Sequence, residues 1–303
     1  MKLAVLYAGQ GAQHPGMGKE FYESSPAFRA AFDSAALDFD LHRVCFEDPD
    51  GVLNQTEYTQ PCMVAFACGV TAVLAEHGVQ PAYAAGLSLG EYSALEAAGV
   101  FTAKQAIELA AYRGKAMADA AKGIDCGMTA VLGLDRIALS ACCEQASALG
   151  CVQICNYNCP GQLVIAGEKA ALAEAIENCK AAGARRALPL AVSGAFHTPL
   201  MAKAAAELRA YVADFTFSAP KMDIYSNLDG KVYDCSDLPA HLEQHMISPV
   251  RWTQLVKNGM AAGLTSACEI GPGKTLTGFA GKISKELTCK TVQDMAGVQA
   301  AAE

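Results

Sequence analysis

A serine between two glycines is the feature of the sequence best suited to chemistry. Ser88 is the middle residue of G-L-S-L-G at 86–90, a G-x-S-x-G pattern. A short apolar run, 82–85, precedes the pattern, and an alanine-rich helical stretch, 91–98, follows it. A strand, a sharp turn and a helix are the context of a nucleophile elbow, in which the serine hydroxyl projects from the turn. We predict a nucleophilic Ser88; a serine with only a structural role in the turn is the alternative.

One histidine stands where a general base for Ser88 could be held. His197 follows a predicted strand, 185–190, and precedes a predicted helix, 200–212. A neutral imidazole can take the proton of an attacking serine hydroxyl. A helix-capping or surface role is the alternative for His197. The remaining histidines lie in polar or helical surroundings and are expected at the surface: His14, His42, His77, His241 and His245.

Two glycine-rich loops look like nucleotide-binding motifs but lack their defining residues. In the loop 8–18, after the first predicted strand, His14 stands where a dinucleotide fingerprint has its third glycine. Before G-P-G-K-T at 271–275, Cys268 stands where a Walker A loop has its first glycine. Nucleotide binding is therefore not expected. The first loop still suits donation of backbone N–H groups, and in serine hydrolases such a loop supplies the second oxyanion donor.

A long helical stretch, 102–121, carries a single arginine in an otherwise mostly apolar segment. Thr102 suits the N-cap of this helix, and Arg113 lies in its middle. Arginines in such positions often extend their charged end to solvent. The helix pattern alone leaves a solvent-facing and a buried, functional Arg113 both open.

The thirteen cysteines do not form a metal-binding pattern. No C-x-x-C occurs, the number is odd, and most of the cysteines lie within apolar runs, where a reduced thiol packs as a small hydrophobic group. Cys151, Cys155 and Cys159 are equally spaced, but ligands of structural zinc are usually closer together and come in two pairs. We expect neither a metal nor a cofactor.

Composition limits the class of protein. The 303 residues are 52% hydrophobic and 18% charged, enough for a large core in one big domain or a big and a small one. A net charge of -8 argues against nonspecific binding to nucleic acids or anionic membranes. The N-terminal apolar run is too short for a signal peptide, and the uncharged stretch 61–75 is shorter than the roughly 20 residues of a membrane span. A soluble, cytoplasmic protein is expected.

The order of predicted strands and helices changes after residue 122. Strand and helix patterns follow one another in the order β-α-β-β-α-β, which is the split βαβ arrangement of ferredoxin-like modules. A compact subdomain is therefore inserted after the elbow. The alanine-rich end, 296–303, is expected to be loose. The predicted strands are 128–132, 152–157, 162–167 and 185–190, and the predicted helices are 135–148 and 169–182.

Several motifs, in order along nearly the whole chain, carry a family resemblance. They are G-Q-G-A-Q at 9–13, G-L-S-L-G-E-Y at 86–92, R-G at 113–114, N-Y-N-C-P-G-Q at 156–162, G-A-F-H at 194–197, P-V-R-W at 249–252 and G-P-G-K at 271–274. Together they resemble the motifs of the malonyl-CoA:acyl carrier protein transacylases of fatty acid synthesis. The resemblance implies an α/β-hydrolase-like core, residues 1–122 and 198–303, with an inserted ferredoxin-like (βαββαβ) subdomain, residues 123–197.

The resemblance also implies an activity. Malonyl would pass from coenzyme A to Ser88 and then to the phosphopantetheine thiol of acyl carrier protein, in a ping-pong reaction with His197 as general base and acid. Malonyl-CoA and acyl carrier protein would be the partners, with coenzyme A thioester as a substrate rather than a cofactor. We expect a monomer that contacts neither nucleic acid nor membrane. The acceptor, a fatty-acid or a polyketide carrier, stays open.

Further site residues are implied by the same resemblance. The backbone N–H groups of Leu89 and Gln10 would hold the oxyanion, and Arg113 would bind the malonyl carboxylate. Phe196 would limit substituents on the carbon between the two carbonyls. A backbone carbonyl of residues 250–251 would orient His197, because no acidic residue is placed like the third member of a triad. Leu87 departs from the family, which often has a histidine before the nucleophile.

Two other functions remain as alternatives. A plain serine esterase or thioesterase would share the elbow but would not need a buried arginine. A catalytically idle docking or scaffold protein would need neither Ser88 nor His197. Hydrolysis of simple esters would indicate the first, and an unreactive Ser88 would indicate the second.

Overall fold

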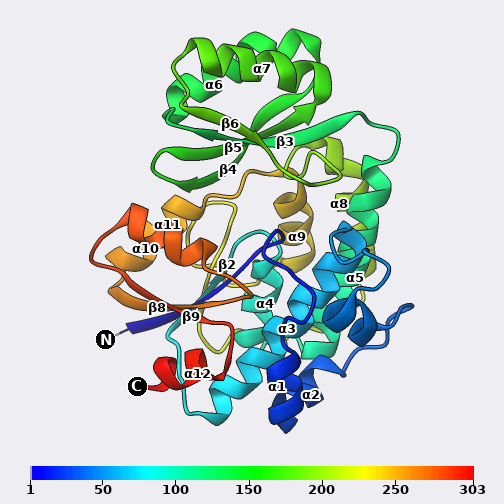
Figure 1. The fold of residues 1–303 in the computed structure, drawn as a ribbon, viewed down its shortest axis with the longest axis vertical. Helices are drawn as coiled ribbons and strands as arrows, with labels where there is room; N and C mark the ends of the chain where they lie inside the picture. The colour runs from blue at the N-terminus through cyan, green and yellow to red at the C-terminus, as the bar shows by residue number, and fades with distance from the viewer. Residues whose placement is uncertain (1) are drawn as a thin grey trace.

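The computed structural model describes residues 2–303 and arranges them around two sheets, one parallel and one antiparallel (Figure 1). The larger sheet is parallel, with the strand order β7-β2-β1-β8-β9. Parallel neighbours require crossover connections, which here contain helices. The strands are β1 (Lys2–Tyr7), β2 (Tyr83–Gly86), β7 (Asp223–Tyr225), β8 (Leu264–Ile270) and β9 (Thr288–Val292).

The larger sheet is buried on both faces. Along β1, Val5 and Tyr7 belong to one core cluster, and Ala4 and Leu6 belong to another. Successive side chains of a strand point to opposite faces, so each face has its own core. The helices of this part are α1 (Lys19–Ser24), α2 (Pro26–Phe32), α3 (Thr56–Glu76), α4 (Gly90–Ala97), α5 (Ala103–Ala121), α8 (Ala202–Val212), α9 (Leu238–Ile247), α10 (Trp252–Ala261), α11 (Thr275–Ile283) and α12 (Met295–Ala302), with short turns at Arg43–Glu47 and Pro199–Met201.

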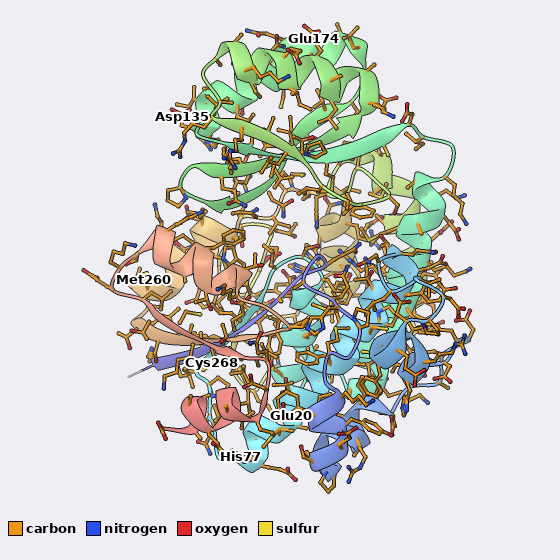
Figure 2. The ribbon with its side chains drawn as sticks, in the orientation of Figure 1. Glu20, His77, Asp135, Glu174, Met260 and Cys268 are labelled. Carbon is orange, nitrogen blue, oxygen red and sulfur yellow. The ribbon has the colours of Figure 1, made fainter. Side chains whose placement is uncertain are left out.

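The smaller sheet is antiparallel and has the strand order β4-β5-β3-β6. Two helices, α6 and α7, cover its outer face, and its other face is turned toward the larger half of the molecule (Figure 1). Figure 2 shows Asp135, the N-cap of α6, and Glu174, on α7, at this end of the molecule. The elements are β3 (Cys126–Leu132), α6 (Arg136–Ala146), a short turn (Ser147–Leu149), β4 (Val152–Cys159), β5 (Gln162–Glu168), α7 (Lys169–Ala181) and β6 (Arg186–Pro189).

The predicted β-α-β-β-α-β order is confirmed, whereas the C-terminal region differs from the prediction. Of residues 296–303, expected to be loose, all but Glu303 belong to α12. This helix is held because Val298 is fully buried and the side chain of Asp294 accepts a hydrogen bond from the backbone N–H of Gly297 at 2.8 Å. The edge strand β9 was not predicted, since its alternation of half-buried and exposed residues gives little apolar signal.

One helix of the structure is long and apolar enough to cross a membrane by length and composition alone. That helix is α3, and 78% of its most apolar window is buried inside the structure. It makes extensive contacts with α5 and α2. The burial identifies α3 as a central packing element of the larger half.

The two glycines of the G-x-S-x-G pattern lie where backbone segments touch. A Cβ added to Gly86 would come within 1.8 Å of the carbonyl carbon of Gly90, and one added to Gly90 would come within 2.2 Å of the carbonyl oxygen of Tyr7. Real atoms do not approach so closely. Only glycine at these positions lets α4 begin directly against β1 and β2.

We therefore expect Gly86→Ala to lower the free energy of unfolding by about 3 kcal/mol or more, because the backbone must move to admit the methyl group. Urea denaturation followed by circular dichroism measures this loss. Gly281→Ala, on α11, is the matched control: nothing lies within 4 Å of its added Cβ, and it should stabilise by up to about 1 kcal/mol. Equal stability of Gly86→Ala and the unchanged protein would contradict the packing argument.

Candidate active site

Ser88 and His197 form a hydrogen-bonded pair. Ser88 lies between β2 and α4, and its backbone has a φ of 53°, in the left-handed region that residues other than glycine rarely adopt. Its Oγ lies 2.6 Å from Nε2 of His197, which is 2% exposed. The predicted strand, turn and helix are thus present, and the two residues predicted to react contact one another.

The other ring nitrogen of His197 faces only carbonyl oxygens. Nδ1 lies 2.9 Å from the carbonyl oxygen of His245 and 3.1 Å from that of Ser248. A carbonyl can only accept, so Nδ1 carries the proton and Nε2 is free to accept the proton of Ser88. An orienting backbone carbonyl was predicted, but its assignment to residues 250–251 was wrong.

The end of α9 explains this correction. The last turn of a helix leaves carbonyl groups without intrahelical partners, and His245 and Ser248 lie at that end of α9. The carbonyl of Val250 is already taken, because it accepts from the backbone N–H of Tyr157 at 2.8 Å. The carbonyl of Arg251 likewise accepts from the first turn of α10, through the N–H of Leu255.

The environment keeps His197 in its basic form. Burial, and then the neighbouring charge of Arg113, lower the pKa of His197 to about 4. The ring is therefore neutral at neutral pH, which is the state needed to accept a proton. Burial also lowers the pKa of His245, beside it, to about 3, so no second imidazolium competes at the site.

Arg113 is buried and points its charge at the serine. It lies on α5, is 1% exposed, and donates from Nη1 to Oε1 of Gln60 at 2.8 Å and from Nη2 to Oγ of Ser88 at 3.3 Å. Its guanidinium carbon lies 5.1 Å from the ring centroid of Tyr92. Among residues 2–303 no carboxylate forms an ion pair with Arg113, and its Nε has no partner. Of the two interpretations of Arg113, the solvent-facing one is wrong, because the side chain is buried.

The predicted site residues line one cavity of about 230 Å³ between the two sheets. The inner face of the smaller sheet closes it from one side, through residues such as Met128 and Asn156. Within the described chain, the backbone N–H groups of Gln10 and Leu89 donate to no protein acceptor, as groups reserved for an oxyanion would. The predicted residues at the cavity are Ser88, His197, Arg113, Gln10, Leu89 and Phe196.

Sequence reasoning missed an asparagine that holds the elbow. Asn227, just after β7, is fully buried; its Oδ1 accepts from the backbone N–H of Ser88 at 2.8 Å, and its Nδ2 donates to the carbonyl of Gly86 at 2.7 Å. Its own backbone N–H donates to Glu91 at 2.8 Å, and Glu91 in turn pairs with His241. This clamp spans both sides of the turn and holds Ser88 in its strained conformation.

The expectation that His241 and His245 lie at the surface was wrong. They are 7% and 0% exposed, respectively. Their spacing of four residues puts them on one face of α9 with Leu238 and Leu242, both buried, and this periodicity was the available signal.

The cysteines give no sign of metal chemistry in the described part of the chain. All thirteen are free thiols, and most are buried. No group of three or more His, Cys, Asp or Glu side chains within residues 2–303 is arranged to hold a metal ion. The groups that the cavity presents include the hydroxyl of Ser88, the imidazole of His197 and the guanidinium of Arg113.

The lowered pKa of His197 predicts the pH dependence of Ser88 reactivity. Phosphonylation of Ser88 by a fluorophosphonate should keep its rate as pH falls past about 6.5, the usual histidine value, and decline only near pH 4. The sign follows because the neutral ring is the active form and a lowered pKa extends its range downward. Intact-mass spectrometry follows the reaction, and circular dichroism confirms the fold at each pH. His197→Ala should abolish the transition; a midpoint near 6.5 would refute the argument.

Comparison with known proteins shows the family of the chain. The acyl transferase domain family matches residues 5–299. The chain is 39% identical over 304 residues to the malonyl CoA-acyl carrier protein transacylase of Salmonella typhimurium, covering 99% of this chain and 98% of the relative. It is 38% identical over 297 residues to that of Bacillus subtilis, covering 97% and 94%.

Solved structures give the same result. An acyl carrier protein S-malonyltransferase from Vibrio cholerae matches with a TM-score of 0.94 at 40% identity, over 99% of both chains. A malonyl-transacylase solved in complex with a type II PKS acyl-carrier protein matches with a TM-score of 0.96 at 37% identity, over 100% of this chain and 99% of that one. The chain therefore belongs to the acyl transferase domain family, as a member of the malonyl CoA-acyl carrier protein transacylases.

Proposed function

We propose that this enzyme transfers malonyl from coenzyme A to the phosphopantetheine thiol of acyl carrier protein through a malonyl-Ser88 intermediate. The observation that carries the proposal is the position of Arg113: a fully buried cation without a carboxylate partner in the described chain, 3.3 Å from the Oγ of a serine paired with a neutral histidine. A carboxylate bound there would bring an attached thioester to Ser88. Arginine suits this role because its planar fork can grip a carboxylate with two hydrogen bonds.

In the first half-reaction, Oγ of Ser88 attacks the thioester carbonyl of malonyl-CoA while Nε2 of His197 takes its proton. The carbonyl oxygen becomes an oxyanion, and the backbone N–H groups of Gln10 and Leu89 stabilise it. The C–S bond then breaks, and His197 returns the proton to the coenzyme A thiolate. The product is a malonyl ester on Ser88 and free coenzyme A.

The second half-reaction reverses these roles. His197 takes the proton of the phosphopantetheine thiol, whose sulfur attacks the ester carbonyl of malonyl-Ser88. The same N–H groups hold the oxyanion until the C–O bond breaks, and His197 then protonates Ser88. Proton transfer and acyl transfer balance without any metal or redox cofactor, and we propose that none takes part.

The proposed architecture is an α/β-hydrolase-like core, residues 1–122 and 198–303, with a ferredoxin-like subdomain, residues 123–197. The buried parallel sheet with its elbow after β2 supports the first description. The antiparallel order β4-β5-β3-β6, with α6 and α7 on one face, supports the second. The net charge of -8 supports a soluble monomer that contacts neither nucleic acid nor membrane, and the proposed location is the cytoplasm.

Two cavity residues bear on the shape of the acyl group. Phe196 is 6% exposed and lines the cavity beside His197, where its ring would limit substituents on the carbon between the two malonyl carbonyls. Leu87, in the position where the family often has a histidine, also lines the cavity. Its side chain is apolar, so it takes no part in proton transfer.

Brief exposure to malonyl-CoA should add the mass of one malonyl group to the protein, on Ser88. Ser88→Ala should form no adduct, and His197→Ala should form it about 10²–10⁴-fold more slowly, as expected for loss of a general base. Intact-mass spectrometry with peptide mapping measures both. An adduct on Ser88→Ala, for instance on a cysteine, would rule out the serine mechanism, and rapid hydrolysis in place of transfer to the carrier would indicate a thioesterase.

Arg113→Ala should slow malonyl transfer by about 10- to 100-fold, the cost of a lost charge-assisted hydrogen bond. Acetyl transfer should hold steady or rise, because acetyl leaves the guanidinium of Arg113 unpaired in the unchanged enzyme. Arg113→Lys is the control, because it keeps the positive charge but loses the planar fork. Its rate of malonyl transfer should lie between those of the unchanged enzyme and Arg113→Ala. The test is to measure the transfer rates of each variant with malonyl-CoA and with acetyl-CoA under the same conditions. Equal losses for malonyl and acetyl would make Arg113 a structural residue.

A further inference from the structure

The general base also contacts the smaller sheet. His197 has a φ of 60°, in the left-handed region, so its backbone conformation must be held by its surroundings. Its carbonyl oxygen accepts a hydrogen bond from Nε2 of Gln153 at 3.0 Å. Gln153 stands on β4, the edge strand of the smaller sheet. One side chain thus joins this sheet to the backbone of the residue that takes the serine proton.

The same strand fixes the segment that orients the imidazole. The free edge of β4 pairs with Val250: the N–H of Val250 donates to the carbonyl of Cys155 at 2.9 Å, and the N–H of Tyr157 donates to the carbonyl of Val250 at 2.8 Å. Val250 is fully buried and lies two residues after Ser248, whose carbonyl accepts from Nδ1 of His197. Both the backbone of His197 and one partner of its ring are therefore tied to β4.

Gln153 does not belong to the acyl cavity. It lines a separate hollow together with Tyr157, Ile247 and Pro249, and it is not among the residues that line the cavity of Ser88. It is half-buried, and among residues 2–303 its side chain makes one hydrogen bond, to the carbonyl oxygen of His197. This hydrogen bond is the contact by which Gln153 can act on the reaction.

We propose that Gln153 is a positioning residue for His197, and that the inserted sheet sets the orientation of the general base through Gln153 and the pairing of β4 with Val250. The inference rests on the proposed function only where its test measures malonyl-Ser88 formation. A glutamine is suited to the contact because its amide N–H₂ can donate to a carbonyl, whereas a carboxylate or an apolar side chain cannot. The smaller sheet is then part of the catalytic apparatus and not only a wall of the cavity.

The test is Gln153→Met, which keeps the length of the side chain and removes the donor. The rate of malonyl-Ser88 formation should fall about tenfold, the change expected for one lost hydrogen bond, while the KM for malonyl-CoA stays the same. Phosphonylation of Ser88 by a fluorophosphonate should fall by the same factor, because it uses the same base. Gln145→Met, the same substitution at an exposed position on α6, is the matched control and should change neither rate.

A double-mutant cycle separates positioning from general damage. In a His197→Ala background, Gln153→Met should have no further effect, because the group it positions is gone. Equal losses in both backgrounds, or a rate of Gln153→Met equal to that of the unchanged enzyme, would overturn the inference. If Gln153→Met does not fold, Gln153→Glu, nearly identical in shape, removes the donor instead, and an unchanged rate would again overturn it.

The two readouts keep this inference separate from the proposed function. An enzyme that forms no malonyl-Ser88 but loses phosphonylation tenfold in Gln153→Met would refute the malonyl proposal and support the positioning role. If the unchanged enzyme and Gln153→Met form malonyl-Ser88 at the same rate, the malonyl proposal is supported and the positioning role is refuted.

Discussion

The site depends on one guanidinium, that of Arg113, which is buried away from water and yet keeps its positive charge. A buried charge is costly unless polar groups surround it, and Arg113 has a single side-chain amide, the serine hydroxyl and an aromatic ring in place of a carboxylate. The packing of α5 on α3 makes this possible. A Cβ on Gly114 would lie 2.7 Å from the carbonyl oxygen of Thr56, so only glycine there lets the two helices approach enough for Gln60 to reach Arg113. The arginine and the glycine after it are thus one structural unit.

Charges of opposite sign lie on the two sides of the elbow. Arg113 faces the cavity and, after burial, is the main reason that the pKa of His197 is low. Glu91 lies behind the turn; its own burial would raise its pKa, but His245 and His241, with hydrogen bonds from His241 and Asn227, bring that pKa to about 2. Glu91 therefore stays ionised and accepts from Asn227. A single buried anion maintains the clamp that holds the serine, without approaching the substrate carboxylate proposed to bind Arg113.

Local features of the sequence predicted much of the fold, and they singled out Ser88 and His197, which contact one another. The elbow at 86–90, the N-cap at Thr102, and the β-α-β-β-α-β order all depend on residues close together in the chain, and all are confirmed. The partners that hold these residues could not be predicted in the same way. Asn227 binds the backbone of a serine 139 residues away, and no local pattern marks an asparagine for that contact. Helical periodicity could have predicted the burial of His241. It could not have predicted the pairing of His241 with Glu91, 150 residues away.

Ser88 and His197 share an unusual property that links them to the whole structure. Both have left-handed backbones although neither is glycine, and both are held by side chains from distant strands or loops: Asn227 for the serine and Gln153 for the histidine. Strained conformations of this kind persist only where the surroundings over-determine them. The distance of 2.6 Å between Oγ and Nε2 is therefore a property of the packed arrangement of both sheets. Neither the elbow nor the loop that carries His197 could establish that distance alone.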